Sequence, residues 1–295
     1  MNRRVLVTGA GGFVGRSLVP ALSAAGWTPL PAGRDTVGPI GRETQWAPHL
    51  SGIDAVIHLA AVGVHGRVGT ASEIAELREV NLYGTERLAA AARAAGISRF
   101  VLVSSARAMA ETSTAPLSAD DPAAPTDPYG QSKRAGEVAV QQAAGDAMEV
   151  VILRPPLVYG PGAGGNFGRL ATAVRRGLPL PLGLVNSPRS MIFVDNLADA
   201  LVHALRCPAG VYLPSDRHDV GLAALARAMA HGLGRQPRLF PCPPALFRLA
   251  GVVTGRSPAV ARLLSPFQVD GRYPGWAPPV DFETAMARSM AEPAA

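Results

Sequence analysis

Residues 3–26, RRVLVTGAGGFVGRSLVPALSAAG, decide the fold of this chain. The stretch RRVLVTG reads as a short buried strand, and the part from residue 13 onward has the apolar spacing of a helix. Between them Gly9, Gly12 and Gly15 stand three residues apart. In such a turn the first glycine permits a tight bend, the second lets a pyrophosphate approach the backbone, and the third lets helix and strand pack closely. Free N–H groups at the helix start face the phosphates, so the turn predicts a dinucleotide site, with a ligand-free glycine turn as the alternative.

The first half of the chain alternates between apolar strands and helices. This alternation predicts an α/β fold, a Rossmann doubly wound parallel sheet with helices on both faces. The further expected strands are DAVIHLAA (54–61), RFVLVSS (99–105) and MEVVILRPP (148–156), and the expected helices are 71–96 and the stretch after Pro128. After residue 156 the texture changes to glycine-rich and proline-rich loops with shorter elements.

This change of texture predicts two domains. We expect an NAD(P)-binding Rossmann domain over residues 1–165 and a smaller C-terminal substrate-binding domain over residues 166–295. Residues 186–206 contain one more strand and helix, which are expected to return to the first domain. The segment WTPLPAGRD (27–35) fits less well, because Pro29 and Pro31 lack an N–H where an internal strand is expected. We therefore expect this strand to be short or irregular.

The end of that second strand distinguishes NAD from NADP. An acidic residue there binds the ribose 2′-hydroxyl, whereas an arginine pairs with a 2′-phosphate. The sequence has Gly33 in the acidic position, followed by Arg34 and Asp35. Arg34 favours NADP, and a slipped register that brings Asp35 into place would restore NAD.

Charge and composition limit the choice of partners. With 48% apolar and 17% charged residues, the 295-residue chain is a folded globular protein. Its formal net charge is +6, but its arginines are spread along the chain with no run longer than two. A nucleic-acid protein more often clusters them with aromatic residues on one element. We therefore expect an anionic cofactor and an anionic small substrate, and no nucleic acid.

Cysteine usage and hydropathy indicate the compartment. Cys207 and Cys242 form no CxxC pair, so neither a disulfide framework nor a metal site is expected. No apolar stretch has membrane-spanning length, and the N-terminus leads directly into the glycine turn, so we expect a cytoplasmic protein. The segment PPALFRLAGVVTG (243–255) could be a core helix or a membrane-surface helix. A peripheral membrane contact and a homodimer are therefore left open.

Lys133 is the single lysine of the chain, since the other 27 of the 28 basic residues are arginines. It follows Tyr129 by four residues on an expected helix, which places both side chains on one face. A nearby ammonium favours the phenolate and lowers the pKa of a tyrosine, which can then shuttle a proton to or from an alcohol oxygen. A compact ammonium also bonds ribose hydroxyls better than a planar guanidinium. The alternative is an exposed helical pair without function.

A hydroxyl is expected to complete this site. Ser104 and Ser105 end the strand RFVLVSS, and strand alternation points only one of them toward Tyr129. The alternative for either serine is a capping role at the strand end.

Together these motifs resemble the extended short-chain dehydrogenase/reductases, in the NAD(P)-dependent epimerase/dehydratase family that acts on nucleotide sugars. The resemblance rests on VTGAGGFVG, HLAA (58–61), VNLYGT around Asn81, the paired serines, YGQSK, LRPPLVYGPG (153–162) and RSMIFVDNLADAL (189–201). It covers nearly the whole chain. The usual VYG or VNG after the serine is missing here.

The resemblance also implies roles by position. It makes Ser105, Tyr129 and Lys133 the catalytic residues and assigns the sugar-nucleotide diphosphate to Asn166 and Arg189, with Ser105 also touching substrate. The residues that it implies for the cofactor are Gly9, Gly12, Phe13, Val14, Gly15, Arg34, Leu59, Ala60, Ala61, Asn81, Tyr129, Lys133 and Pro155. The implied cofactor is NADP or NAD, with no metal.

The implied function is hydride transfer at C4 of a UDP-sugar in bacterial surface polysaccharide synthesis. The enzyme would be either a 4-epimerase, which returns the hydride to the other face of the sugar, or a 4-keto-sugar reductase. The alternative is a non-catalytic NADP-binding sensor or scaffold of the same fold. The presence of both Tyr129 and Lys133 argues against that alternative.

Overall fold

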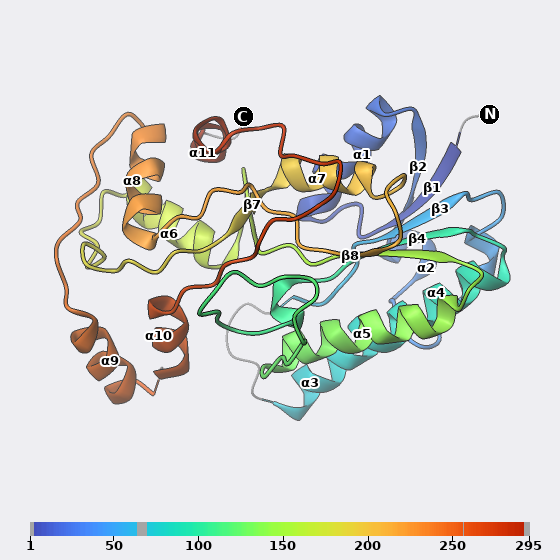
Figure 1. Cartoon of the computed structure of the whole chain (residues 1–295), viewed down its shortest axis with the longest axis horizontal. Helices are drawn as coiled ribbons and strands as arrows, with labels where there is room; N and C mark the ends of the chain where they lie inside the picture. The colour runs from blue at the N-terminus through green and yellow to red at the C-terminus, as the bar shows by residue number, and fades with distance from the viewer. Residues whose placement is uncertain (1–2, 64–69, 256, 292–295) are drawn as a thin grey trace.

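A six-stranded parallel sheet with helices on both faces forms the centre of the molecule (Figure 1). The computed structural model describes residues 3–63, 70–255 and 257–291. Its strand order is β2-β1-β3-β4-β5-β8. The strands are β1 (Arg3–Thr8), β2 (Trp27–Ala32), β3 (Ala55–His58), β4 (Arg99–Val103), β5 (Glu149–Leu153) and β8 (Gly210–Tyr212). The predicted doubly wound fold is confirmed.

Alternate residues of each strand supply two cores on opposite faces of the sheet. On β1, Val5 packs with Leu18 of α1 and Leu197 of α7, whereas Leu6 packs in the cluster of α4 and α5. Both faces are covered, which explains why these strands read as nearly unbroken apolar runs. The helices over the first face are α1 (Phe13–Ala24) and α7 (Val194–His203), and those over the second are α3 (Ala71–Arg78), α4 (Thr85–Ala94) and α5 (Pro128–Ala144).

The expectation for the second strand was wrong. β2 is a regular six-residue strand, and it pairs with β1 along its whole length, from Trp27 to Ala32. Within the described residues it lies at the edge of the sheet, not inside it. In an edge strand, the N–H groups of alternate residues point away from the neighbouring strand. Pro29 and Pro31 are two residues apart, so both can occupy such positions without loss of a hydrogen bond between β1 and β2.

The long helix expected over 71–96 is interrupted in its middle. Between α3 and α4 lies a π-helical segment, Glu79–Gly84, and Asn81 within it is buried. Helix α5 packs directly on this segment at Gly136, where an added Cβ would lie 2.3 Å from the carbonyl oxygen of Asn81. A glycine at 136 therefore lets α5 approach the segment that carries Asn81.

The second half of the chain adds a smaller unit. It contains a two-stranded parallel sheet of β6 (Leu157–Tyr159) and β7 (Met191–Phe193), whose core includes Tyr159, Phe167 and Phe193. Its helices are α6 (Gly165–Arg175), α8 (Leu222–Gly232), α9 (Pro244–Val253), α10 (Ser257–Leu264) and α11 (Phe282–Met290). Helix α7 packs on α1, and β8 joins the main sheet. The division into residues 1–165 and 166–295, with 186–206 returning, stays a prediction. None of the described helices has the length and apolar character to cross a membrane.

Candidate active site

The glycine turn leaves no room for side chains at two positions. Gly9 has φ +69°, and a Cβ there would lie 2.9 Å from the backbone nitrogen of Ala60. At Gly15 a Cβ would lie 2.3 Å from the carbonyl oxygen of Ala10. Gly12 is the N-cap of α1 and offers no side-chain cap, so the first N–H groups of the helix are available to a ligand. The turn therefore has the shape that an incoming pyrophosphate requires.

A cavity of about 1060 Å³ opens at the carboxyl ends of β1, β2 and β3. Gly9, Arg34, Ala60 and Ala61 line it, as predicted for cofactor contacts. Ligands of open α/β sheets bind at this edge, so these residues fit a dinucleotide. The side chains of Phe13, Val14 and Leu59 pack against the apolar cores, and their contact with a cofactor stays a prediction.

Arg34 is the first residue of the short helix α2 (Arg34–Val37) and faces the cavity directly after β2. Asp35 is not one of the described residues that line the cavity. A second arginine, Arg42, also lines the cavity. Glu79 pairs with the Arg42 guanidinium at 2.8 Å, and this guanidinium lies 4.2 Å from the ring centroid of Tyr83. Arg34 therefore faces this end of the cavity as a cation, whereas the charge of Arg42 is paired with Glu79, which also lines the cavity.

Asn81 fastens the loop that follows β3 to helix α5. Its Oδ1 accepts from the Val62 backbone N–H at 2.8 Å, and its Nδ2 donates to the Val62 carbonyl at 3.1 Å and to Ser132 Oγ at 3.0 Å. Both ends of the amide are engaged, so Asn81 holds the loop with Ala60 and Ala61 in place. A direct contact of Asn81 with a cofactor stays a prediction.

Tyr129 lies in the first turn of α5, one residue beyond Pro128. Its hydroxyl lies near Ser105, and the Arg107 guanidinium lies 5.0 Å from the centroid of its ring. Asp127 caps α5 by accepting from the Gly130 N–H and pairs with Arg107 at 2.6 Å. The residues Ser105, Arg107 and Tyr129 therefore form one cluster at the end of β4.

The electrostatics of Tyr129 differ from the sequence-based expectation. Burial raises the pKa of Tyr129, while the charge of Arg107 and the neighbouring Ser105 hydroxyl act to lower it. We expected Lys133 to supply the lowering charge. In the structure its Nζ instead donates to the Val103 carbonyl at 2.8 Å, and Arg107 is the cation that acts on the phenol.

Lys133 is buried, with 5% of its surface exposed. Burial lowers the pKa of Lys133 to about 8, and the carboxylate of Glu137, one turn along α5, opposes that shift. Lys133 reaches the end of β4, where Val103 directly precedes the two serines. A compact ammonium is suited to such a buried position, since a guanidinium has five N–H groups to satisfy.

The two serines face different surroundings. Ser104 donates to Glu137 Oε1 at 2.5 Å within a buried network in which Arg154 binds the same carboxylate through two bonds, at 2.9 and 2.7 Å. Ser105 Oγ instead accepts from the Arg107 N–H at 3.2 Å, which caps the turn after β4, and it lies near Tyr129. The carbonyl of Pro155, a predicted cofactor contact, accepts from the Ala106 N–H at 2.9 Å and so fixes the backbone next to Ser105.

The two predicted substrate residues lie in the second half of the chain. Asn166 is exposed in the first turn of α6. Arg189 is half-buried; its guanidinium donates to the carbonyls of Arg262 and Ser265, and its buried Nε has no partner in the described structure. Burial lowers the pKa of Arg189. Neither residue contacts the Tyr129 cluster in this structure.

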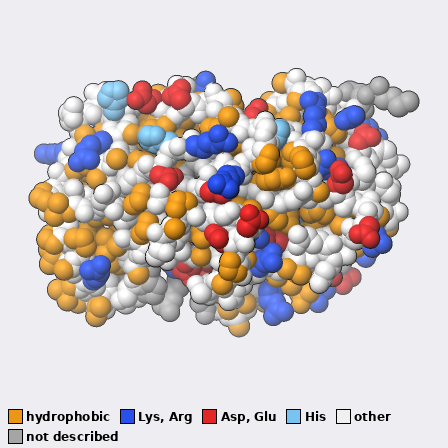
Figure 2. Space-filling model, in the orientation of Figure 1, with side chains coloured by type: hydrophobic (Ala, Val, Ile, Leu, Met, Phe, Trp, Pro, Cys, Tyr) orange, Lys and Arg blue, Asp and Glu red, His pale blue; other side chains and the backbone are white. Residues whose placement is uncertain are grey.

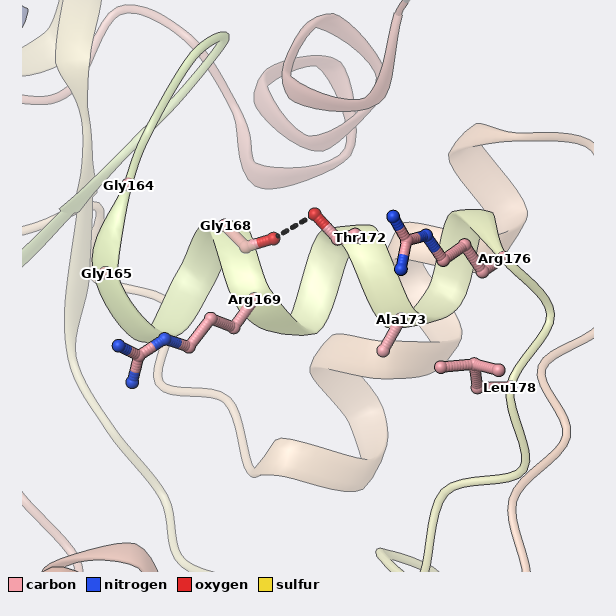
Figure 3. A pocket seen from close by; sticks show the side chains of 8 residues that line it. All are labelled: Gly164, Gly165, Gly168, Arg169, Thr172, Ala173, Arg176 and Leu178. Atoms are coloured by element: carbon pink, nitrogen blue, oxygen red, sulfur yellow. Dashed lines mark hydrogen bonds between the residues drawn. The ribbon is translucent and has the colours of Figure 1, made fainter.

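A second cavity, of about 450 Å³, lies on α6, but it does not include Asn166 (Figure 3). Its lining residues are Gly164, Gly165, Gly168, Arg169, Thr172, Ala173, Arg176 and Leu178. Arg169 and Arg176 extend in different directions, and Ala173 faces Leu178. The two cations do not converge, so this cavity lacks the geometry of a phosphate site.

Sequence reasoning missed three groups in or near the site. They are Arg107, the buried Glu137–Arg154 pair, and His58, whose ring nitrogens bond Thr8 Oγ1 at 2.6 Å and Thr85 Oγ1 at 3.0 Å. The missing VYG after Ser105 was the one available sign of Arg107, because Arg107 occupies part of that stretch. No local pattern predicts the other two, since their partners lie far away in the sequence.

The doubly wound sheet, the glycine turn and the Tyr129–Lys133 pair define an extended short-chain dehydrogenase/reductase. The chain belongs to the NAD dependent epimerase/dehydratase family, whose model matches residues 5–214. It is therefore an NAD(P)-dependent enzyme of the epimerase and reductase type.

Individual relatives agree with this assignment. The chain is 35% identical over 301 residues to a UDP-glucose 4-epimerase of Vibrio cholerae, covering 95% of this chain and 92% of the relative. It is also 35% identical over 261 residues to a ceramide reductase of Caulobacter vibrioides, covering 84% and 76%. Among solved structures, MoeE5 in complex with UDP-glucuronic acid and NAD is 25% identical with a TM-score of 0.78, covering 97% of each chain. The human epimerase family protein SDR39U1 with NADPH is 25% identical with a TM-score of 0.76, covering 97% and 99%.

Proposed function

We propose that this enzyme transfers hydride at C4 of a UDP-sugar and acts as a 4-epimerase. The observation that carries the proposal is the grouping of Ser105, Arg107 and Tyr129 where β4 ends and α5 begins, with Lys133 one turn further along the same helix. The relative with which the chain shares 35% identity over nearly its whole length is a UDP-glucose 4-epimerase, which supports this sugar chemistry.

The roles of the three residues follow from their chemistry. Tyr129 takes a proton from the sugar hydroxyl during oxidation and returns one during reduction. A nearby cation stabilises the phenolate, so Tyr129 can alternate between the neutral phenol and the phenolate. Ser105 holds the sugar oxygen beside Tyr129. The nicotinamide group supplies the hydride acceptor and donor when the cofactor is bound. Lys133 holds the hydroxyls of the nicotinamide ribose.

Other predicted contacts belong to the same proposal. Gly12, Asn81 and Pro155 contribute to cofactor binding with the residues that line the cavity. Asn166 and Arg189 bind the diphosphate of the UDP-sugar, and the partnerless Nε of Arg189 supports such a role. The pathway is bacterial surface polysaccharide synthesis in the cytoplasm.

A second candidate is a reductase that consumes NADPH. The specific observation in its favour is Arg34, which lines the cavity directly after β2. Among the described residues, no carboxylate of β2 or α2 lines the cavity. A reductase releases its cofactor after one hydride transfer, whereas an epimerase retains it. The similarity to a ceramide reductase shows that reductases occur among the relatives.

The purified enzyme decides between these activities. Bound nucleotide is released by denaturation and identified by chromatography, and turnover is followed by separating UDP-glucose from UDP-galactose. Retained NAD with interconversion of the two sugars supports the epimerase, and NADPH oxidation that depends on a UDP-4-keto sugar supports the reductase.

Two variants test the assigned proton carrier. Tyr129→Phe should lose activity by about 10³-fold while still binding the dinucleotide. Tyr212→Phe, which removes a phenol from β8, serves as the matched control and should keep full activity. Dinucleotide binding without any sugar turnover in the wild type would instead favour the sensor or scaffold.

A further inference from the structure

Helix α9 exposes an unusually large apolar face. Leu246, Leu249, Val252 and Val253 are 54, 61, 69 and 78% exposed, and among the described residues they are the most exposed large hydrophobic side chains. Leu246, Leu249 and Val253 follow each other at steps of three and four residues, which places them on one side of the helix. These side chains therefore form a continuous apolar strip and are not scattered singly.

The opposite side of α9 is the one that packs on the protein. At Gly251 an added Cβ would lie 3.0 Å from Val260 of α10, so α9 and α10 approach closely there. Gly251 is the buried residue of α9. Because Gly251 lies across the helix from Leu249 and Val253, the helix is already packed on its inner side, and the apolar strip points outward.

Neighbouring segments extend the apolar surface. Phe240, 45% exposed, lies four residues before α9, and its carbonyl accepts from the Gly183 N–H at 3.0 Å. That contact brings Leu184, 52% exposed, next to the chain that leads into α9. In Figure 2 hydrophobic side chains gather at the lower left, over α9, with a basic side chain among them.

The charge of this region is one-sided. Between Asp219 and Asp270 the sequence contains no aspartate or glutamate. The same stretch contains six arginines, of which Arg262 pairs with Glu111 from outside the stretch at 2.9 Å. Arg248 is exposed on α9 beside the apolar strip. An apolar helix face embedded in a wholly basic segment complements a surface that is apolar inside and anionic outside.

We propose that α9 docks this enzyme on the surface of an anionic lipid membrane, with its apolar strip inserted among the acyl chains and Arg248 near the lipid phosphates. The choice of an anionic membrane as the partner needs both the apolar strip of α9 and the absence of acidic residues between Asp219 and Asp270. A second copy of the chain would match the apolar strip, but it would bring the same basic segment into contact with itself. The proposal does not depend on which reaction the enzyme catalyses.

Vesicle flotation with the full-length protein tests the proposal. The wild type should float with mixed phosphatidylcholine and phosphatidylglycerol vesicles and should not float with pure phosphatidylcholine vesicles. High salt should weaken binding, because the arginine contribution is screened. The double variant Leu246→Gln, Leu249→Gln should reduce the vesicle partition coefficient by at least about tenfold. Arg248→Gln should reduce it about fivefold.

Matched controls separate docking from general effects. Val138→Gln on α5 also replaces an exposed apolar side chain, 36% exposed, and Arg206→Gln removes an exposed arginine from another part of the surface. Both should float like the wild type, and circular dichroism should show every variant folded. Failure of the wild type to float with anionic vesicles at low salt would overturn the proposal. Light scattering would also overturn the proposal if the wild type is a dimer and the α9 double variant is a monomer. The apolar strip would then be a protein interface.

Discussion

The guanidinium of Arg107 lies 5.0 Å from the ring centroid of Tyr129 and is held there by Asp127 at 2.6 Å. Asp127 is also the residue that caps helix α5, two positions before Tyr129. One carboxylate therefore fixes both the start of the helix that carries the phenol and the cation that acts on it. From the spacing of Tyr129 and Lys133 we expected the lysine to lower the pKa of Tyr129. In the structure Arg107 is the charge that lowers it.

Arg107→Leu should shift the pH dependence of turnover. The Arg107 charge lowers the pKa of Tyr129, so its removal raises that pKa and leaves less phenolate at neutral pH. The limb of the kcat profile that reports phenol ionisation should move to higher pH, and kcat at pH 7 should fall by about tenfold. Arg107→Lys keeps the charge and should keep most of the activity. An unchanged limb in Arg107→Leu would show that Arg107 does not act on Tyr129.

Asp127→Asn should move the same limb in the opposite direction. Asp127 raises the pKa of Tyr129 through its negative charge, and asparagine keeps a side-chain oxygen that can accept from Arg107. The neutral amide should therefore lower the pKa of Tyr129 and make the phenolate available at lower pH. Asparagine is an equally good N-cap, so the start of α5 should be preserved. The pH profile of kcat measures the shift, and circular dichroism checks the helix. A shift to higher pH would contradict the assigned electrostatics.

Much of the site follows from local patterns. The glycine turn and the Tyr129–Lys133 spacing depend on residues within a few positions of each other, so the sequence predicts them directly. The role of Arg107 depends on how the end of β4 meets the start of α5, which sequence spacing does not contain. The same is true of β2, whose prolines looked unsuitable only because an internal position was assumed for a strand that lies at the edge.

The paired serines should respond differently to substitution. Ser105→Ala removes the hydroxyl beside Tyr129 and should lower kcat by about 10²-fold with little loss of stability. Ser104→Ala removes a donor from the buried Glu137 carboxylate and should cost about 1–3 kcal/mol of unfolding free energy while the chemistry survives. Steady-state kinetics and urea unfolding of both variants give the comparison. The reverse pattern would mean that Ser104 is the catalytic hydroxyl.

Arg34→Asp should change the choice of cofactor. Arg34 lines the cavity at the end of β2, where an arginine pairs with a 2′-phosphate and a carboxylate repels one. The ratio of affinities for NADP over NAD should fall by about 10²-fold, which corresponds to about 2.7 kcal/mol. Fluorescence titration with each reduced dinucleotide measures the ratio without any need for a sugar substrate. Arg235→Asp on the surface controls for the change in net charge, and an unchanged ratio in Arg34→Asp would remove the argument for NADP.

His58 should make the fold sensitive to acid. Burial and the charge of Lys133 lower the pKa of His58 to about 3, whereas an unfolded histidine titrates at 6.5. The unfolded state therefore binds more protons between these values, and the stability contributed by the neutral ring is lost as the pH falls below about 6.5. At pH 5 the loss relative to pH 8 should be about 2 kcal/mol.

His58→Gln isolates this contribution. Glutamine can bond Thr8 or Thr85 without titrating, so the variant is expected to be less stable than the wild type at pH 8 but to lose less stability on going to pH 5. His231→Gln, at the end of α8, changes an exposed histidine and should leave the wild-type pH dependence intact. Urea unfolding of the three proteins, followed by circular dichroism at both pH values, gives the six free energies. If the wild type and His58→Gln lose equal stability between pH 8 and pH 5, the buried imidazole is not the group that couples folding to protons.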